Sequence, residues 1–265
     1  MQPLYDAIGS TYCATRRADP EIASELARLV GASGGLRYLD VACGAGNYTS
    51  ALAALGGQWH GVDISEVMLG QAMRKAADVE WKIGSATALP YEAGLFDGAI
   101  CSLAIHHFPE LEAPFREVWR VLDEGRFVIF TAFPEQMHAY WLCHYFPEMM
   151  RRSAEKMPAR EAVVSALLAA KFDVESIVPF HVTARLQDLF LYSGKARPEL
   201  YFDPAVRANI SSFASLCTDA ELHDGLRALR ADLDSGRFAQ VAQAASSSGA
   251  GDYVFVVARK PKVGD

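Results

Sequence analysis

Residues 39–49 read Leu39-Asp-Val-Ala-Cys-Gly-Ala-Gly-Asn-Tyr-Thr49, and the expected fold follows from this segment. An apolar run typical of a strand leads into it, and a helical pattern follows it. Gly44 and Gly46 allow a tight turn and a close approach of the backbone to a ligand. The first turn of the following helix directs free N–H groups toward the same place, which favours a carboxylate or a phosphate.

Short apolar runs and helical patterns alternate on both sides of this segment. The expected strands cover residues 37–42, 58–62, 79–83, 96–102, 126–133, 173–178 and 252–259. The expected helices cover residues 19–30, 47–55, 65–76, 110–122, 135–157 and 159–170, and the pattern over 184–248 is largely helical. Continuous apolar strands separated by helices indicate a parallel sheet covered on both faces, which is a doubly wound α/β fold.

The bulk composition excludes several classes of function. The net charge is −7 and no cluster of Lys and Arg is present, which argues against a nucleic-acid partner. The five cysteines are scattered without a Cys-X-X-Cys spacing, so we expect neither a disulfide framework nor a zinc site. The N-terminal residues lack the pattern of a signal peptide, and no apolar run is long enough to span a bilayer. We therefore expect a cytoplasmic protein without a membrane partner.

An acidic residue at the end of the second expected strand narrows the choice of ligand. Asp63 follows Gly46 by 17 residues and can accept hydrogen bonds from both hydroxyls of a ribose. This fits either a dinucleotide or S-adenosylmethionine (SAM). Thr49 stands where the nicotinamide fingerprint has its third glycine, and Asp40 suits the ammonium group of a methionine moiety better than a phosphate. SAM is therefore favoured over a nicotinamide cofactor.

Four motifs in order resemble those of the class I SAM-dependent methyltransferases. They are Asp40-Val-Ala-Cys-Gly-Ala-Gly46, Gly61-Val-Asp-Ile-Ser-Glu-Val-Met-Leu69, Gly84-Ser-Ala-Thr-Ala-Leu-Pro-Tyr91 and Phe96-Asp-Gly-Ala-Ile-Cys-Ser-Leu-Ala-Ile-His-His-Phe108. Their order and spacing resemble the ubiquinone-biosynthesis-like subgroup, methyltransferase type 11, over residues 5 to about 133. The resemblance implies a Rossmann-like, mostly parallel seven-stranded sheet with a helical substrate lid.

The resemblance also implies a domain organisation and a set of cofactor contacts. Residues 1–180 would form the SAM-binding domain with an N-terminal lid helix, 181–250 a helical cap, and 251–265 the strand that returns to the sheet. The implied cofactor residues are Tyr12, Arg17, Asp40, Gly44, Gly46, Asp63, Ile64, Met68, Ser85, Ala86 and Ser102.

Within that set, each part of the cofactor has its own residues. Asp40, Gly44 and Gly46 would line the methionine end and Asp63 would hold the ribose. Ile64 and Met68 would pack on the adenine, and Ser85 and Ala86 would meet its edge. Many relatives carry, at the position of Ser85, an acidic residue whose side chain bonds the adenine amine. The resemblance therefore supports the backbone contact of Ala86 with the adenine more than a side-chain contact of Ser85. Arg17 would reach the carboxylate of SAM with its guanidinium fork, and Tyr12 would cover the cofactor.

Three residues are candidates for action on the acceptor. His107 follows the fourth expected strand, where a histidine can serve as a base near neutral pH. Tyr140 and His144 are four residues apart, so on a helix they share a face and can form an aromatic wall of the pocket. Each of the three also fits a purely structural role, as a packed or backbone-bonded side chain.

The sequence thus predicts in-line transfer of a methyl group from SAM to a small-molecule acceptor, with release of S-adenosylhomocysteine and without a metal. The element accepting the methyl group, nitrogen, oxygen, carbon or sulfur, stays open. We expect a monomer or a homodimer. Two alternatives remain: a non-catalytic SAM-binding regulatory protein and, less favoured, a nicotinamide-dependent oxidoreductase.

Overall fold

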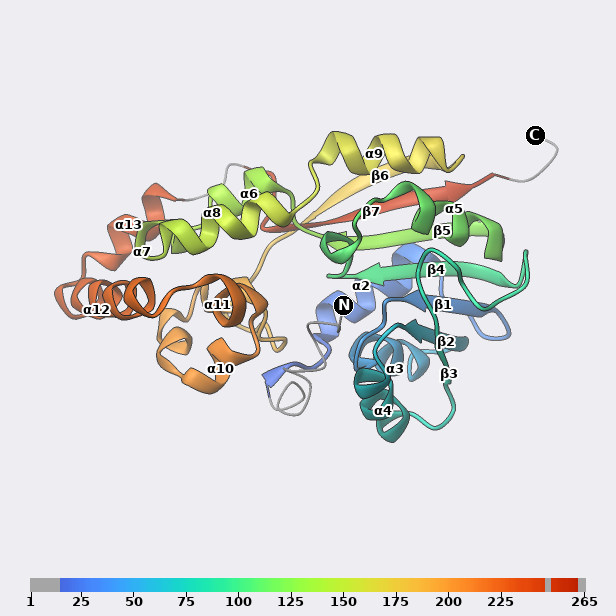
Figure 1. The fold of residues 1–265 in the computed structure, drawn as a ribbon, viewed down its shortest axis with the longest axis horizontal. Coiled ribbons are helices and arrows are strands. Elements are labelled where there is room, and N and C mark those ends of the chain that lie inside the picture. Colours follow the sequence, from blue (N-terminus) through green and yellow to red (C-terminus); the bar gives the residue numbers. More distant parts are fainter. Residues whose placement is uncertain (1–14, 246–248, 262–265) are drawn as a thin grey trace.

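The structure, a computed structural model, describes residues 15–245 and 249–261. Its centre is a seven-stranded sheet with the strand order β3-β2-β1-β4-β5-β7-β6 (Figure 1). Neighbouring strands are parallel except at β7, which runs antiparallel to both β5 and β6. The strands are β1 (Arg37–Val41), β2 (Gln58–Asp63), β3 (Glu80–Ile83), β4 (Phe96–Ser102), β5 (Leu122–Thr131), β6 (Asp173–Phe180) and β7 (Tyr253–Lys260). The predicted mostly parallel, doubly wound α/β fold is confirmed.

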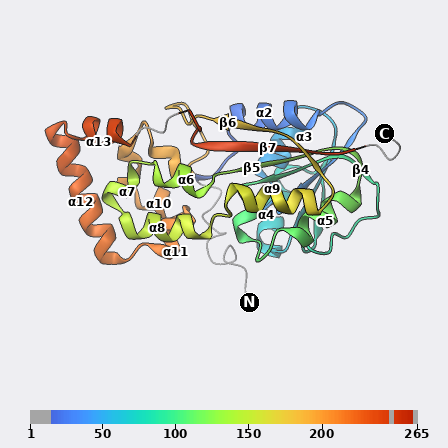
Figure 2. The ribbon, with the colours of Figure 1, turned by 90° about the horizontal axis from the view of Figure 1, so that it is seen from above.

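Helices cover both faces of the sheet. α2 (Pro20–Val30) and α3 (Asn47–Ala53) lie on one face, and α5 (Glu112–Val121) and α9 (Arg160–Ala169) lie on the other (Figure 2). α4 (Glu66–Lys75) packs beside β2 and β3. Residues 126–131 of β5 and most of β7 are buried or nearly so, which explains why these sequences are almost continuously apolar, whereas the edge strands β3 and β6 are more exposed and more polar.

The ends of α2 show why helices form where the sequence predicts them. The carboxylate of Asp19 accepts hydrogen bonds from the backbone N–H groups of Glu21 and Ile22, at 3.0 and 3.2 Å. Pro20 occupies the first turn, where a missing N–H costs nothing. Gly31 ends the helix in the left-handed conformation, with φ of 77°.

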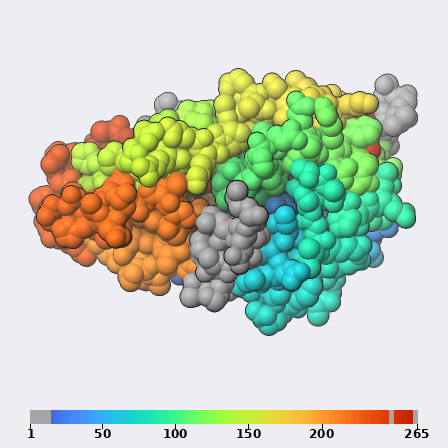
Figure 3. Space-filling model, viewed as in Figure 1, coloured from blue at the N-terminus to red at the C-terminus, as the bar shows by residue number. Residues whose placement is uncertain are grey.

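A helical cap extends from one edge of the sheet, and two separate segments of the chain build it. The first follows β5 and contains α6 (Pro134–His138), α7 (Leu142–Tyr145) and α8 (Pro147–Lys156). The second lies between β6 and β7 and contains η2 (Leu191–Gly194), η3 (Pro198–Phe202), α10 (Pro204–Ala208), α11 (Ser211–Leu216), α12 (Asp219–Ser235) and α13 (Phe238–Ala244). In the space-filling view the cap forms one end of the molecule (Figure 3).

The first cap segment lies outside the range 181–250 that the sequence predicts for the cap. The reason is topological. β5 and β6 run in the same direction, since both are antiparallel to β7. Their carboxyl ends therefore meet at the same edge of the sheet, and the helices that follow each strand pack together there, α8 against α11 and α7 against α12.

Two glycines on neighbouring elements leave room for the ring of Trp81. A Cβ atom added at Gly61 in β2 would lie 2.4 Å from the Trp81 ring, and one added at Gly46 would also lie 2.4 Å from it. Trp81 is fixed in this position by a 3.0 Å hydrogen bond from its Nε1 to the carbonyl oxygen of Ala76. The Trp81 ring therefore fills the space between the start of α3 and strand β2. Side chains at positions 46 and 61 would otherwise occupy this space.

We predict that Gly61→Ala lowers the free energy of unfolding by about 1–3 kcal/mol, because an overpacked interior must shift to admit the extra carbon. Gly61 does not have a positive φ, so the effect is steric. Urea-induced unfolding measures it. Gly70→Ala is the matched control, because a Cβ at Gly70 in α4 meets nothing within 4 Å. Equal stability of the two variants would contradict the close packing of Trp81.

Candidate cofactor and acceptor site

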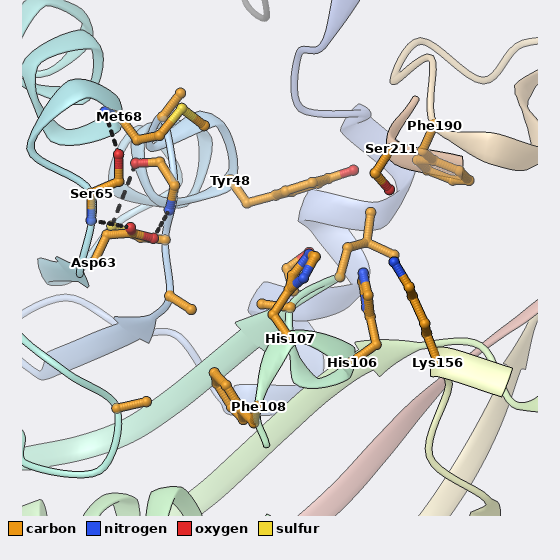
Figure 4. Close-up of a pocket in the computed structure, with 18 of the residues that line it drawn as sticks. Tyr48, Asp63, Ser65, Met68, His106, His107, Phe108, Lys156, Phe190 and Ser211 are labelled. Carbon is orange, nitrogen blue, oxygen red and sulfur yellow. Dashed lines mark hydrogen bonds between the residues drawn. The ribbon is translucent and has the colours of Figure 1, made fainter. Parts of the chain in front are cut away.

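A cavity of about 700 Å³ opens where β1, β2 and β4 end, between the sheet and the cap (Figure 4). Its walls come from the loops after these strands, from α8 and from the second cap segment. This is the place where open parallel sheets bind ligands, because the loops after the strands diverge there. Of the predicted cofactor residues, Asp40, Gly44, Asp63, Ile64, Met68, Ser85, Ala86 and Ser102 line it.

The backbone around the cavity takes unusual conformations. Ala42 after β1 and Leu103 after β4 have φ values of 56° and 53°, and Gly44 has a φ of 54°. All three residues line the cavity. A non-glycine residue in the left-handed region carries a conformational cost, and such residues concentrate at binding sites. Glycine at position 44 avoids this cost and presents only backbone to the cavity.

Asp40 is a buried carboxyl group at the floor of the cavity. Its side chain is 2% exposed, and its Oδ2 accepts a 2.6 Å hydrogen bond from the hydroxyl of Thr49. Its Oδ1 has no hydrogen-bond partner. Burial raises the pKa of Asp40 to about 7, the Thr49 bond opposes the rise, and the charge of Asp63 adds to it. The carboxyl thus has one oxygen left for a cationic or hydrogen-bonding ligand.

Asp63 ties the end of β2 to the glycine loop. Its Oδ2 accepts a 2.8 Å hydrogen bond from the backbone N–H of Gly44, and its Oδ1 accepts one of 2.9 Å from Ser65. Ser65 in turn accepts from the N–H of Met68 and caps α4 (Figure 4). Each carboxylate oxygen keeps further lone pairs, so Asp63 can accept hydrogen bonds from a diol while it holds the loop.

The side of the cavity beyond Asp63 is apolar. Ile64 is 62% exposed although it is a large aliphatic residue, and Met68 is buried beneath. The two form a surface that suits a flat ring. Across from them, the hydroxyl of Ser85 bonds within its own turn, to the N–H of Thr87 at 3.2 Å and to its hydroxyl at 2.9 Å. The Ser85 side chain is therefore already engaged.

Three predicted cofactor residues stand apart from this wall. Gly46 does not line the cavity, because its open side faces Trp81 and Ala72 instead of a ligand. This corrects its placement at the methionine end. Arg17 is exposed and also lies outside the lining, whereas its neighbour Arg16 is part of it. Tyr12 lies outside the residues that the structure describes.

Arg16 belongs to a buried polar cluster that the sequence does not reveal. Its guanidinium contacts the carboxylate of Asp188 at 2.6 and 3.2 Å, and the hydroxyl of Tyr48 donates to the same carboxylate at 3.1 Å. The cluster links the N-terminal segment, α3 and the second cap segment at the cavity wall. Asp188 is 172 residues from Arg16 along the chain, so no local pattern signals the pairing.

Two adjacent histidines after β4 reach the cavity. His106 and His107 form η1 together with Ile105, and their ring centroids are 4.0 Å apart. Burial, helped by the nearby positive charge of Lys156, lowers the pKa of His106 to about 3 and that of His107 to about 4. Both rings are thus neutral near pH 7, and the lowered pKa values make them weak proton acceptors. The sequence predicts His107 for this role, and the structure adds His106.

Tyr140 and His144 do not line the cavity, which corrects their placement at the acceptor. The hydroxyl of Tyr140 is 2.7 Å from that of Tyr201, and its ring stacks on Tyr192 with centroids 3.9 Å apart, so it belongs to the core of the cap. The His144 side chain is 47% exposed and 4.0 Å from Asp232. The helix that would place them on one face is broken between His138 and Leu142.

Residues of the cap that sequence patterns do not single out complete the cavity. Ser153 and Lys156 come from α8, Phe190 precedes η2, and Ile210 and Ser211 lie at the start of α11. Figure 4 shows Lys156 beside the two histidines, and Phe190 and Ser211 beyond Tyr48. These positions are set by how two distant cap segments pack on the sheet edge, which no local motif encodes.

Residues 15–245 and 249–261 contain no group of three or more His, Cys, Asp or Glu side chains arranged to hold a metal ion. Within the same described ranges, every helix is either too short or too polar to traverse a lipid bilayer.

The sequence and the fold match known methyltransferases. Residues 39–130 match the family described as a methyltransferase domain, type 11. A demethylmenaquinone methyltransferase of Thermus thermophilus is 30% identical over 56% of this chain and 80% of its own length. That of Bacillus mycoides is 34% identical over 40% of this chain. The chain covers 48% of the Bacillus protein, so it spans about half the length of the first curated relatives it matches.

Solved structures agree over nearly the whole chain. A protein of Anabaena variabilis, named "putative methyltransferase from antibiotic biosynthesis pathway", superposes with a TM-score of 0.82 at 31% identity, over 93% of this chain and 99% of its own. The [4+2]-cyclase SpnF superposes with a TM-score of 0.55 at 22% identity, over 92% of this chain and 81% of its own, and shows the fold alone. The chain belongs to the class I SAM-dependent methyltransferases.

We predict that Asp40 makes the cofactor-free protein less stable as the pH rises from about 4 to about 7. An unfolded aspartate ionises near pH 4, whereas in the folded protein burial raises the pKa of Asp40 to about 7. Over this window the unfolded chain loses the proton and the folded protein keeps it, which lowers the free energy of unfolding by on the order of 2–4 kcal/mol. Asp40→Asn removes the dependence, and urea unfolding of both proteins at pH 5 and pH 7.5 measures it. Parallel pH curves for the two proteins would contradict the prediction.

Proposed function

We propose that the protein transfers the methyl group of SAM to a small, largely apolar acceptor bound beneath the cap, and releases S-adenosylhomocysteine. The observation that carries this proposal is the continuity of the 700 Å³ cavity. It runs from the glycine loop and Asp63 to the histidines and the cap, so it has room for a cofactor and a second molecule. A cavity for the cofactor alone would end at the glycine loop.

The cofactor's place follows from the polar groups along the β1, β2 and β4 edge. Asp63 holds the ribose hydroxyls, and the free Oδ1 of Asp40 accepts from the ammonium group of the methionine moiety. The adenine packs on the surface that Ile64 and Met68 form, with the backbone of Ala86 at its edge. Ser102, whose buried hydroxyl has no partner, faces the methionine end from β4.

Methyl transfer from a sulfonium requires alignment and the exclusion of water more than a set of catalytic groups. Apolar side chains of the cap, which line the cavity opposite the sheet, support this exclusion of water. Where the acceptor loses a proton, His106 and His107 are the neutral bases in reach. Tyr140 and His144 have no part in this proposal.

The relatives support a small-molecule acceptor without defining it. Two of them are demethylmenaquinone methyltransferases by name, and the chain covers 80% of one and 48% of the other. A non-catalytic SAM-binding protein is the competing proposal. The acceptor-sized space beside the histidines favours catalysis, because a binding protein has no use for it.

The assignment of Asp63 predicts its effect on cofactor affinity. Asp63→Ala is expected to weaken the binding of S-adenosylhomocysteine about 10- to 100-fold, because it removes hydrogen bonds to a charged acceptor and loosens the glycine loop. Isothermal titration calorimetry measures the change. Asp78→Ala, on the exposed loop before β3, is the control and should bind as the wild type does. Unchanged affinity of Asp63→Ala would contradict the ribose assignment.

The reaction itself is tested with SAM that carries a labelled methyl group. Wild-type protein, incubated with this SAM and organic extracts of cells, is expected to transfer label into an extractable small molecule and to release one S-adenosylhomocysteine for each methyl group transferred. Asp63→Ala should transfer at least tenfold less at the same SAM concentration. Tight binding of SAM without any transfer would favour the non-catalytic alternative.

A further inference from the structure

At the acceptor end of the cavity, two buried polar atoms have no hydrogen-bond partner among the described residues. The hydroxyl of Ser153 is buried, with the residue 4% exposed, and has no hydrogen-bond partner. The Nδ1 of His106 is buried and equally without one. Buried polar atoms are nearly always paired, so unpaired ones that line a cavity indicate a ligand that pairs with them. Neither atom is used by the proposed cofactor contacts.

Lys156 stands beside these two groups. Ser153 and Lys156 are three residues apart on α8 and so share the face that borders the cavity. The positive charge of Lys156 is close enough to His106 and His107 to lower the pKa of both. Figure 4 shows its amine end beside the His106 ring. Among the described residues, no carboxylate forms an ion pair with it.

The charges around the cavity leave Lys156 uncompensated. The acids in the lining are Asp40 and Asp63 near the glycine loop, and Asp188, which is neutralised by Arg16. On its other side, Lys156 borders an outer hollow lined by Glu110, Glu112 and Glu155. Of these, Glu112 pairs with Arg116 at 2.6 Å and Glu155 pairs with Arg151.

We propose that the acceptor carries a carboxylate, which Lys156 anchors while the hydroxyl of Ser153 and the Nδ1–H of His106 donate to its oxygens. The proposal rests on the proposed function, since it names the class of acceptor. Among the described residues of the lining, Lys156 is the one Lys or Arg without an ion pair, which suits one negative charge, and the apolar side chains of Phe190, Ile210 and Leu216 suit a hydrocarbon or aromatic body. The acceptor class is thus an apolar monocarboxylic acid, and Lys156 is a residue that determines specificity.

The test compares acids with alcohols of the same shape. Wild-type protein saturated with S-adenosylhomocysteine is titrated by calorimetry with 2-naphthoate, cinnamate and decanoate, and with the three matching primary alcohols. At least one acid is expected to bind about tenfold more tightly than its alcohol, the gain from one partly exposed charge-assisted contact. In Lys156→Gln the preference should disappear, because the acid loses affinity while the alcohol does not. Ser153→Ala should reduce the preference by less.

Arg152→Gln is the matched control, because it removes an equal charge from the same helix at an exposed position that pairs with Glu148. It should keep the full preference. The proposal is overturned if no acid is preferred by the wild type, or if Lys156→Gln keeps the preference. Failure of S-adenosylhomocysteine to bind would instead refute the proposed function, and titrations of the cofactor-free protein would still show whether Lys156 selects acids.

Discussion

The parallel register of β1 with its two neighbours is the constraint on which the site depends. Asp40 lies opposite Gly61 of β2 and Ile100 of β4, so the three strands end nearly level. Asp63 at the end of β2 can therefore reach the N–H of Gly44 at 2.8 Å, and the loops after all three strands open into one cavity. A shift of one residue in either pairing would turn these side chains to the opposite face of the sheet.

The cavity wall contains several buried polar groups that have no hydrogen-bond partner among the described residues. The Oδ1 of Asp40, the hydroxyls of Ser102 and Ser153 and the Nδ1 of His106 are all buried without partners, and all belong to residues that line it. Each such group costs free energy in a folded protein unless a ligand or a water molecule satisfies it. The unsatisfied groups fall into two sets, one at the glycine loop and one at α8, which agrees with two ligands rather than one.

The cap contributes to the site because polar contacts hold it to the sheet. Asp188 joins the second cap segment to Arg16 and Tyr48. Asp252 accepts from the backbone N–H of Val182 at 2.7 Å and pairs with Lys195 at 2.7 Å, which fixes the cap where it returns to β7. The two carboxylates in these contacts are buried, and the contacts join the two parts of the protein over sequence separations of 57 to 172 residues.

The α/β class, the strand that precedes the glycine loop and the role proposed for Asp63 are readable from the sequence, because apolar periodicity and a glycine-rich turn are local properties. The residues on the acceptor side of the cavity cannot be predicted from the sequence. The spacing of Tyr140 and His144 predicts one shared helical face, but the helix breaks after His138 and Tyr140 packs in the core of the cap. Lys156 and Ser153 line the cavity together with His106 instead. Which side chains meet there depends on the packing of two cap segments that leave the sheet from different strands, and a local pattern contains no information about that contact.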